Sequence, residues 1–247
     1  MMPPRKTAIS RVEAFSDGMM AVAAALLVVS LEAPRTYDEL INVLYGFVPF
    51  GLSFAALIYM WYVHTVLFRR YPLNDGISII VNGVLMFTIL FYVYPLKFLA
   101  TSFASLFTNR AGGSVTSWEQ LQSLFIIYAL GWIVVFLLVA LLYRRASATR
   151  DSLGLTPLDA YDAITWSRHY LGFAAAGILS ILVALTGIGL RFGLPGMVYA
   201  TIGIFSWLNF KSRDKEREEL AATVAAHPQL ADTKEIPRIV VAVEDAL

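Results

Sequence analysis

The sequence predicts an all-α integral membrane protein with six transmembrane helices per chain. Hydrophobic residues make up 58% of the 247 residues, charged residues only 15%, and the mean hydropathy is +0.66. A soluble domain is about 45–50% apolar and about 25% charged, so this composition indicates a membrane protein. Two further observations agree with it: long apolar runs, and an uneven distribution of Lys and Arg between them.

Six apolar runs have the length of about 18 or more residues that a helix needs to cross a bilayer. They cover roughly residues 8–31, 41–68, 75–105, 118–143, 166–190 and 195–211. The first ends at Glu32 and Pro34, and the second is closed by Arg69 and Arg70. In the third, Pro95 lacks a backbone N–H and predicts a kink.

The remaining boundaries follow from charged and helix-breaking residues. Asp75 is suited to capping the third helix, Arg144 and Arg145 close the fourth, and Pro195 suits the first turn of the sixth. The mixed charges of residues 211–220 predict a solvated extension of the last helix. We therefore divide the chain into a transmembrane domain, residues 1–211, and a cytoplasmic C-terminal tail, residues 212–247.

The Lys and Arg distribution orients the six helices. One side of the membrane receives only Arg35, Arg110 and Arg191 between the spans. The other side receives the basic residues that flank the remaining spans: Arg5, Lys6, Arg11, Arg69, Arg70, Arg144, Arg145, Arg150 and Arg168. Because cytoplasmic segments are enriched in Lys and Arg, both termini are expected in the cytoplasm.

Several classes of function find no support in the sequence. The formal net charge of +1 gives no reason to expect a nucleic-acid partner. The absence of cysteine excludes a disulfide framework, a thiolate metal site and a thiol nucleophile. The three histidines, His64, His169 and His227, have no metal-ligand spacing. We expect no enzyme activity, no metal site and no cofactor.

The first run opens with polar residues, unlike an ordinary membrane anchor. Within RVEAFSDG, Arg11, Phe15 and Gly18 fall on neighbouring turns of a helix, while Ser16 and Asp17 point to flanking faces. Charged groups at the mouth of an apolar helix often mark a functional site facing protein or water. The alternative is simple anchoring at the membrane surface, with Asp17 facing cytosolic water.

The apolar body of the same helix has one continuous face. Val22, Leu26 and Val29 lie at i, i+4 and i+7, a spacing that forms hydrophobic constrictions when repeated around a symmetry axis. Ordinary helix packing produces the same pattern and remains the alternative. The small residues around Ala25 favour close packing against other helices.

Polar residues also occur in the second and third runs. Trp61 and His64 share a face near the cytoplasmic end of the second, where His64 could pair with Asp17 or donate to a backbone carbonyl. Asn82 lies about two turns into the third helix, where an unsatisfied amide is costly. An aromatic belt at headgroup depth is the alternative for Trp61 and His64. A shared network among the first three helices is sterically reasonable.

These residues resemble the RxxxFSDG signature of the transmembrane protein 175 family of potassium channels. The matching positions are Arg11, Phe15, Ser16, Asp17 and Gly18, with Trp61, His64 and Asn82 on the next two helices. The resemblance implies a homotetramer with the first helix of each subunit around a central pore. It implies that the signature residues form a structural network between helices. It also implies that Val22 forms the constriction of the pore and that Leu26 and Val29 form the next layers.

The resemblance also implies how the chain would handle ions. The family lacks a TVGYG filter, and this chain has none. Family members commonly carry threonine where this chain has Ala25, so we expect only modest selectivity for K⁺ over Na⁺. Two alternatives remain: a secondary transporter, which needs repeats or broken helices, and a non-conducting scaffold. The expected setting is the plasma membrane of a prokaryote, with a lipid bilayer and K⁺ as partners.

Overall fold

The computed structural model describes residues 10–29, 34–45, 47–108, 115 and 117–226. The described residues form helices and contain no strand, so the all-α fold is confirmed. The α-helices are α1 (Arg11–Val29), α2 (Tyr37–Tyr45), α3 (Phe47–Arg70), α4 (Gly76–Thr108), α5 (Trp118–Ala148), α6 (Arg150–Leu153), α7 (Pro157–Thr186), α8 (Leu194–Met197) and α9 (Thr201–Ala226). Two short 3₁₀ turns, η1 (Leu190–Phe192) and η2 (Val198–Ala200), flank α8.

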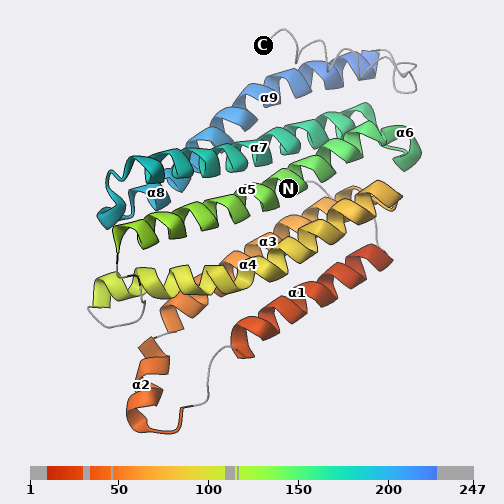
Figure 1. Ribbon diagram of the computed structural model, residues 1–247. Coiled ribbons are helices and arrows are strands. Elements are labelled where there is room, and N and C mark those ends of the chain that lie inside the picture. Colours follow the sequence, from red (N-terminus) through yellow and green to blue (C-terminus); the bar gives the residue numbers. More distant parts are fainter. Residues whose placement is uncertain (1–9, 30–33, 46, 109–114, 116, 227–247) are drawn as a thin grey trace.

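The long helices lie side by side with α1 at one edge and α9 at the other (Figure 1). Helices α3 and α4 separate α1 from α5, and α7 lies between α5 and α9. The core is densest between α5 and α7, where Trp132 and Phe136 pack against Tyr170 and Phe173. Helix α1 contacts α3 and α4.

Five described helices contain segments long and apolar enough to cross a membrane. These segments are Arg11–Val29, Phe50–Arg70, Gly76–Pro95, Trp118–Ala148 and Pro157–Thr186. They correspond to the first five predicted runs. The sixth run, 195–211, differs from the uninterrupted helix expected there, because it is divided among α8, η2 and the start of α9. The charged residues from Lys211 onward leave only a short apolar stretch, residues 201–210, in α9.

Two helices begin or end elsewhere than the apolar runs suggested. Helix α7 begins at Pro157, nine residues before the predicted fifth span, because Thr156 and Asp159 form a reciprocal capping box at its start. Helix α9 continues unbroken past residue 211 to Ala226. The predicted boundary between the domain at 1–211 and the tail at 212–247 thus falls inside one helix and remains a prediction.

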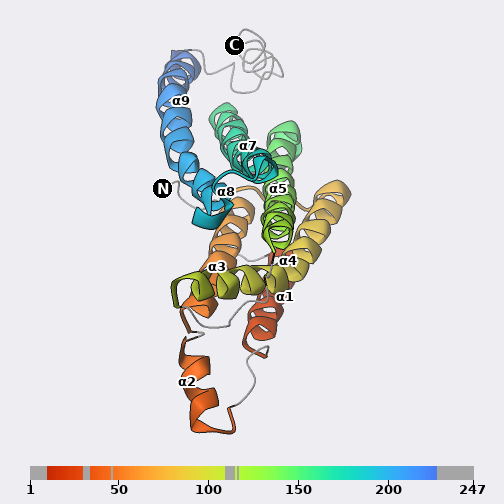
Figure 2. The same ribbon diagram turned by 60° about the vertical axis from the view of Figure 1, so that its left-hand side comes forward.

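The second and third apolar runs are also less regular than single straight helices. The second run is two helices, α2 and α3, where one was expected. Helix α4 changes direction along its length in Figure 2, as Pro95 predicted. Four basic or acidic residues used in the sequence argument, Arg5, Lys6, Glu32 and Arg110, lie outside the described residues, as does the tail from residue 227.

Candidate functional site at the first helix

Helix α1 begins with a capping box that the sequence analysis missed. The backbone N–H of Ser10 donates to Glu13 Oε2 at 2.7 Å, and the backbone N–H of Glu13 donates to Ser10 Oγ at 3.2 Å. This reciprocal pair satisfies two of the free N–H groups at a helix start. The signal was present in the order Ser-x-x-Glu. It fixes where α1 begins and therefore the register of the signature residues behind it.

A buried chain of hydrogen bonds joins α1, α4 and α3. Asn82 Nδ2 donates to Ser16 Oγ at 2.9 Å, and Asn82 Oδ1 lies 2.9 Å from His64 Nε2. Ser16 Oγ donates in turn to the Val12 carbonyl of its own helix at 2.9 Å. Ser16, His64 and Asn82 are 0%, 2% and 3% exposed. Buried polar groups are costly unless they are paired, and this chain of bonds pairs all three side chains.

A second contact joins α1 to α3 nearer the surface. Trp61 Nε1 donates to Asp17 Oδ1 at 2.8 Å, and both residues are exposed. The sequence analysis considered His64 as the partner of Asp17, and this was wrong. His64 lies one turn nearer the Arg70 end of α3 and is buried, where Asn82 reaches it and its ring stacks on Phe68 at a centroid distance of 4.4 Å.

The other signature residues do not enter this network in the single chain. Arg11 is exposed at the start of α1, and its side chain forms no hydrogen bond or ion pair with another described residue. Phe15 is 63% exposed. At Gly18, an added Cβ would meet no atom within 4 Å. The structure therefore brings together Ser16, His64 and Asn82, and separately Asp17 and Trp61, but not Arg11.

The two faces of α1 differ in burial. Met20, Ala23 and Leu27 are buried and continue the face on which Ser16 lies. Val22 is 50% exposed and Val29 is 76% exposed, Ala25 is also exposed, and Leu26 is half-buried at the margin. Helix α1 thus packs one face against its own chain and leaves an apolar face uncovered. Three of the four predicted pore residues lie on that uncovered face.

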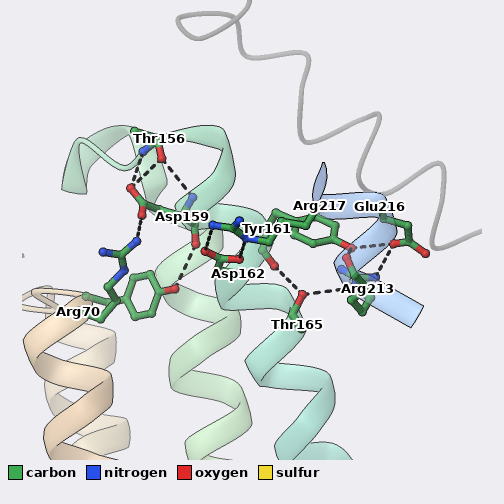
Figure 3. Close-up of polar contacts among 10 residues, drawn as sticks. Arg70, Thr156, Asp159, Tyr161, Asp162, Thr165, Arg213, Glu216 and Arg217 are labelled. Atoms are coloured by element: carbon green, nitrogen blue, oxygen red, sulfur yellow. Dashed lines mark hydrogen bonds and ion pairs between the residues drawn. The ribbon is translucent and has the colours of Figure 1, made fainter. Parts of the chain in front are cut away.

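Charged residues form a second cluster at the same end of the bundle, between α3, α7 and α9 (Figure 3). Arg70 pairs with Asp159 of the α7 capping box, and Arg217 Nε donates to Asp162 Oδ1 at 2.8 Å. Arg213 Nε donates to Thr165 Oγ1 at 3.2 Å. From the sequence, Arg70 was used only to orient the helices, and Arg213 and Arg217 were expected in a solvated extension, whereas Arg213 is 3% exposed. The sequence analysis had no means of finding carboxylate partners 55 and 89 positions away.

An ion pair between α4 and α5 completes the polar contacts at this end. Arg145 Nη2 donates to Asp75 Oδ2 at 2.9 Å, and Ser78 Oγ donates to the same carboxylate. Desolvation acts to raise the pKa of Asp75, but the bonds from Ser78 and Arg145 outweigh it and leave the pKa below its ordinary value. The predicted N-cap at Asp75 therefore also anchors α5.

The arrangement around α1 is suited to holding helices together rather than to chemistry on a substrate. Among the described residues, no three His, Asp or Glu side chains gather as metal ligands would. The polar atoms of the network are turned toward one another between helices, and the exposed face of α1 is apolar. Such a face can border a water-filled path but offers no nucleophile or base.

The network makes a prediction about stability. Replacing Asn82 with Leu removes both interhelical bonds and leaves Ser16 and His64 buried without that partner. We expect the free energy of unfolding to fall by about 1–3 kcal/mol, since one such bond in a membrane protein is worth about 0.6–2 kcal/mol. Denaturant unfolding in mixed micelles measures this change.

A matched control lies on the same helix. The Thr88 hydroxyl donates only to the Val84 carbonyl of α4. Thr88→Val should therefore change the free energy of unfolding by no more than about 0.5 kcal/mol. Equal effects of the two substitutions would show that the interhelical bonds contribute nothing beyond local helix stability.

Comparison with known proteins identifies relatives of this chain. The family described as endosomal/lysosomal potassium channel TMEM175 matches residues 11–92. A potassium channel from Marivirga tractuosa is 33% identical over 184 residues, 71% of this chain and 74% of that protein. A potassium channel from Chamaesiphon minutus is 26% identical over 178 residues, 68% of this chain and 79% of that protein.

A solved structure agrees in fold. The crystal structure of a variant of the potassium channel MtTMEM175, in complex with a nanobody–MBP fusion protein, superposes with a TM-score of 0.73 and 29% identity. The match covers 86% of this chain and 97% of that one. The resemblance inferred from Arg11–Gly18 is confirmed, and so is the prediction that the chain is not an enzyme. The chain belongs to the TMEM175 family of potassium channels.

Proposed function

We propose that this chain forms a homotetrameric, potassium-permeable channel in which the uncovered face of α1 lines a central pore. One observation carries the proposal: α1 lies at the edge of the bundle, buries one face against α3 and α4, and leaves an apolar face uncovered (Figure 1). A fourfold arrangement around that face would cover it and enclose a path. The family membership supports K⁺ as the permeant ion.

Val22 forms the constriction in this proposal. Its side chain is half-exposed on the uncovered face of α1, about one turn beyond the signature. A ring of four valines would exclude water when narrow and admit ions when wide, which is gating by dewetting. Val29 would form a second layer, and Leu26, which is half-buried, would border the path from its side. No cofactor is required.

The network around Asn82 would act as a brace. Helix α1 has neighbours on one face only, so a pore helix needs strong attachment there. The bonds Ser16–Asn82–His64 and Asp17–Trp61 tie α1 to both helices behind it. In this proposal the signature residues hold the pore helix in register, and the apolar residues further along meet the ion.

The distribution of charge supports an orientation with both termini in the cytoplasm of a prokaryotic cell. Arg69, Arg144 and Arg150 lie at the end of the bundle that carries the signature network, and Arg35 and Arg191 lie at the other end. Segments rich in Lys and Arg stay on the cytoplasmic side. The plasma membrane is the setting in which this asymmetry would be established.

The pore assignment is tested by K⁺ flux from liposomes. Val22→Trp should lower the flux at least about tenfold, because indole rings would fill a constriction that valines leave passable. Val22→Ala should increase leak through the widened ring. The control is Val28→Trp, because Val28 lies on the same helix and is also 50% exposed, but its place six residues after Val22 turns it about 120° around the helix axis.

The outcomes separate a pore residue from a generally exposed one. Val28→Trp should leave flux within about twofold of the unchanged protein, provided that both tryptophan variants reconstitute equally. If Val22→Trp and Val28→Trp reduce flux alike, the path does not run past Val22. If neither Val22 substitution alters flux, α1 does not line the path.

Selectivity is tested at Ala25. This exposed residue provides no oxygen with which to replace a water ligand of K⁺, so we propose modest selectivity over Na⁺. Ala25→Thr would add one hydroxyl per subunit. We expect the permeability ratio for K⁺ over Na⁺ to rise about 3- to 10-fold, the factor given by an interaction near 1 kcal/mol. Reversal potentials under opposed K⁺ and Na⁺ gradients measure it, with Ala25→Val as the control without an oxygen.

The oligomeric state provides an independent check. The chain has no cysteine, so a single Cys introduced at Val29 forms disulfides only with its counterpart in another subunit. A complex of four chains by mass in detergent, and oxidised dimers of the Val29→Cys variant, are the expected results. A strictly monomeric mass in lipid-like detergent would exclude a pore shared between subunits.

A further inference from the structure

A cavity of about 450 Å³ lies at the end of the bundle opposite the signature network. Its walls are the first turns of α5 and the segment that follows α7, which lie side by side in Figure 1. Its lining includes Trp118, Glu119, Gln122, Arg191 and Phe192. The volume falls within the range of about 300–1,000 Å³ typical of small-molecule sites.

The backbone that shapes the cavity is tightly folded. Gly187, Gly189 and Gly193 have φ angles of 71°, 69° and 68°, a region that side chains rarely adopt. At Gly189, an added Cβ would lie 2.8 Å from Leu194 Cβ. On the opposite wall, Gln122 Nε2 donates to the Ala184 carbonyl at 2.7 Å and ties α5 to the end of α7. The cavity is therefore held between two braced walls.

The cavity carries one charge of each sign. Glu119 and Arg191 are exposed residues that both line it, and among the described residues neither forms an ion pair or a side-chain hydrogen bond. At the other end of the bundle, by contrast, Arg70, Arg145 and Arg217 all bind carboxylates. An arginine and a glutamate that share a cavity without binding each other leave both charges available to a ligand.

Two aromatic side chains complete the site. Trp118 and Phe192 line the cavity and are 60% and 74% exposed. The cavity lies where the apolar segments Trp118–Ala148 and Pro157–Thr186 begin and end, and a bilayer crossed by these segments would place it at the depth of the lipid headgroups. Tryptophan is enriched at that depth, and its ring face attracts ammonium groups.

We propose that this cavity binds the headgroup of a zwitterionic phospholipid from the adjacent leaflet. The guanidinium of Arg191 would bind the phosphate, to which arginine is matched in charge and geometry. Glu119 and the Trp118 ring would hold the ammonium group. The exposed Phe192 would contact the glycerol and upper acyl region. Only a ligand with both charges, presented at this depth, uses all four residues.

Native mass spectrometry of the purified full-length protein tests the proposal. Phosphatidylethanolamine, phosphatidylglycerol and diacylglycerol would each be titrated into the detergent-solubilised protein. Arg191→Gln should lower the affinity for both phospholipids about tenfold or more, which is the effect of losing one charge-assisted bond. Glu119→Gln should lower the affinity for phosphatidylethanolamine but not the affinity for phosphatidylglycerol, because phosphatidylglycerol has no ammonium group. Diacylglycerol should bind weakly to every variant.

The matched control is Arg35→Gln, because Arg35 is an exposed arginine at the same end of the bundle but does not line the cavity. Its phospholipid affinities should be unchanged. Equal weakening by Arg35→Gln and Arg191→Gln, or equal binding of diacylglycerol and phosphatidylethanolamine, overturns the proposal. Binding of free phosphoethanolamine as tight as that of the lipid would assign the cavity to a soluble ligand and also overturn it. K⁺ flux measured in parallel reports separately on the pore.

Discussion

The hydrogen bonds of Asn82 are the constraint on which the position of α1 depends. One amide joins three helices, donating to Ser16 on α1 and meeting His64 on α3 from its place on α4. In a membrane, apolar surfaces do not drive helices together, because lipid tails are as apolar as the side chains. Interhelical bonds and close packing must therefore hold a helix that has neighbours on only one face.

This constraint explains why α1 has two faces of different chemistry. Ser16 begins the buried face, and small or flexible residues, Ala23 and Met20, continue it against α3 and α4. The opposite face has no polar side chain in the body of the helix, where Val22 and Val29 are exposed. Ser16 and the proposed ion-facing residues therefore belong to one helix but lie on different surfaces. A change in one surface need not disturb the other.

The apolar segments could be predicted from local pattern, whereas most pairings between distant side chains could not. Five apolar segments and the Pro95 kink follow from length, hydropathy and a missing N–H. The residues of the network were identified, but His64 was considered as a partner for Asp17, because spacing along a helix does not reveal which neighbouring helix supplies a bond. The pairing of Arg70 with Asp159 was missed for the same reason.

The two ends of the bundle use charge in opposite ways. At the end with the signature network, arginines from α3, α5 and α9 are neutralised by carboxylates on α7 and beside α4, so these charges hold helices together. At the other end, Glu119 and Arg191 share a cavity without binding each other. The first end is therefore braced by ion pairs between helices, whereas the second leaves two opposite charges without an ion pair among the described residues.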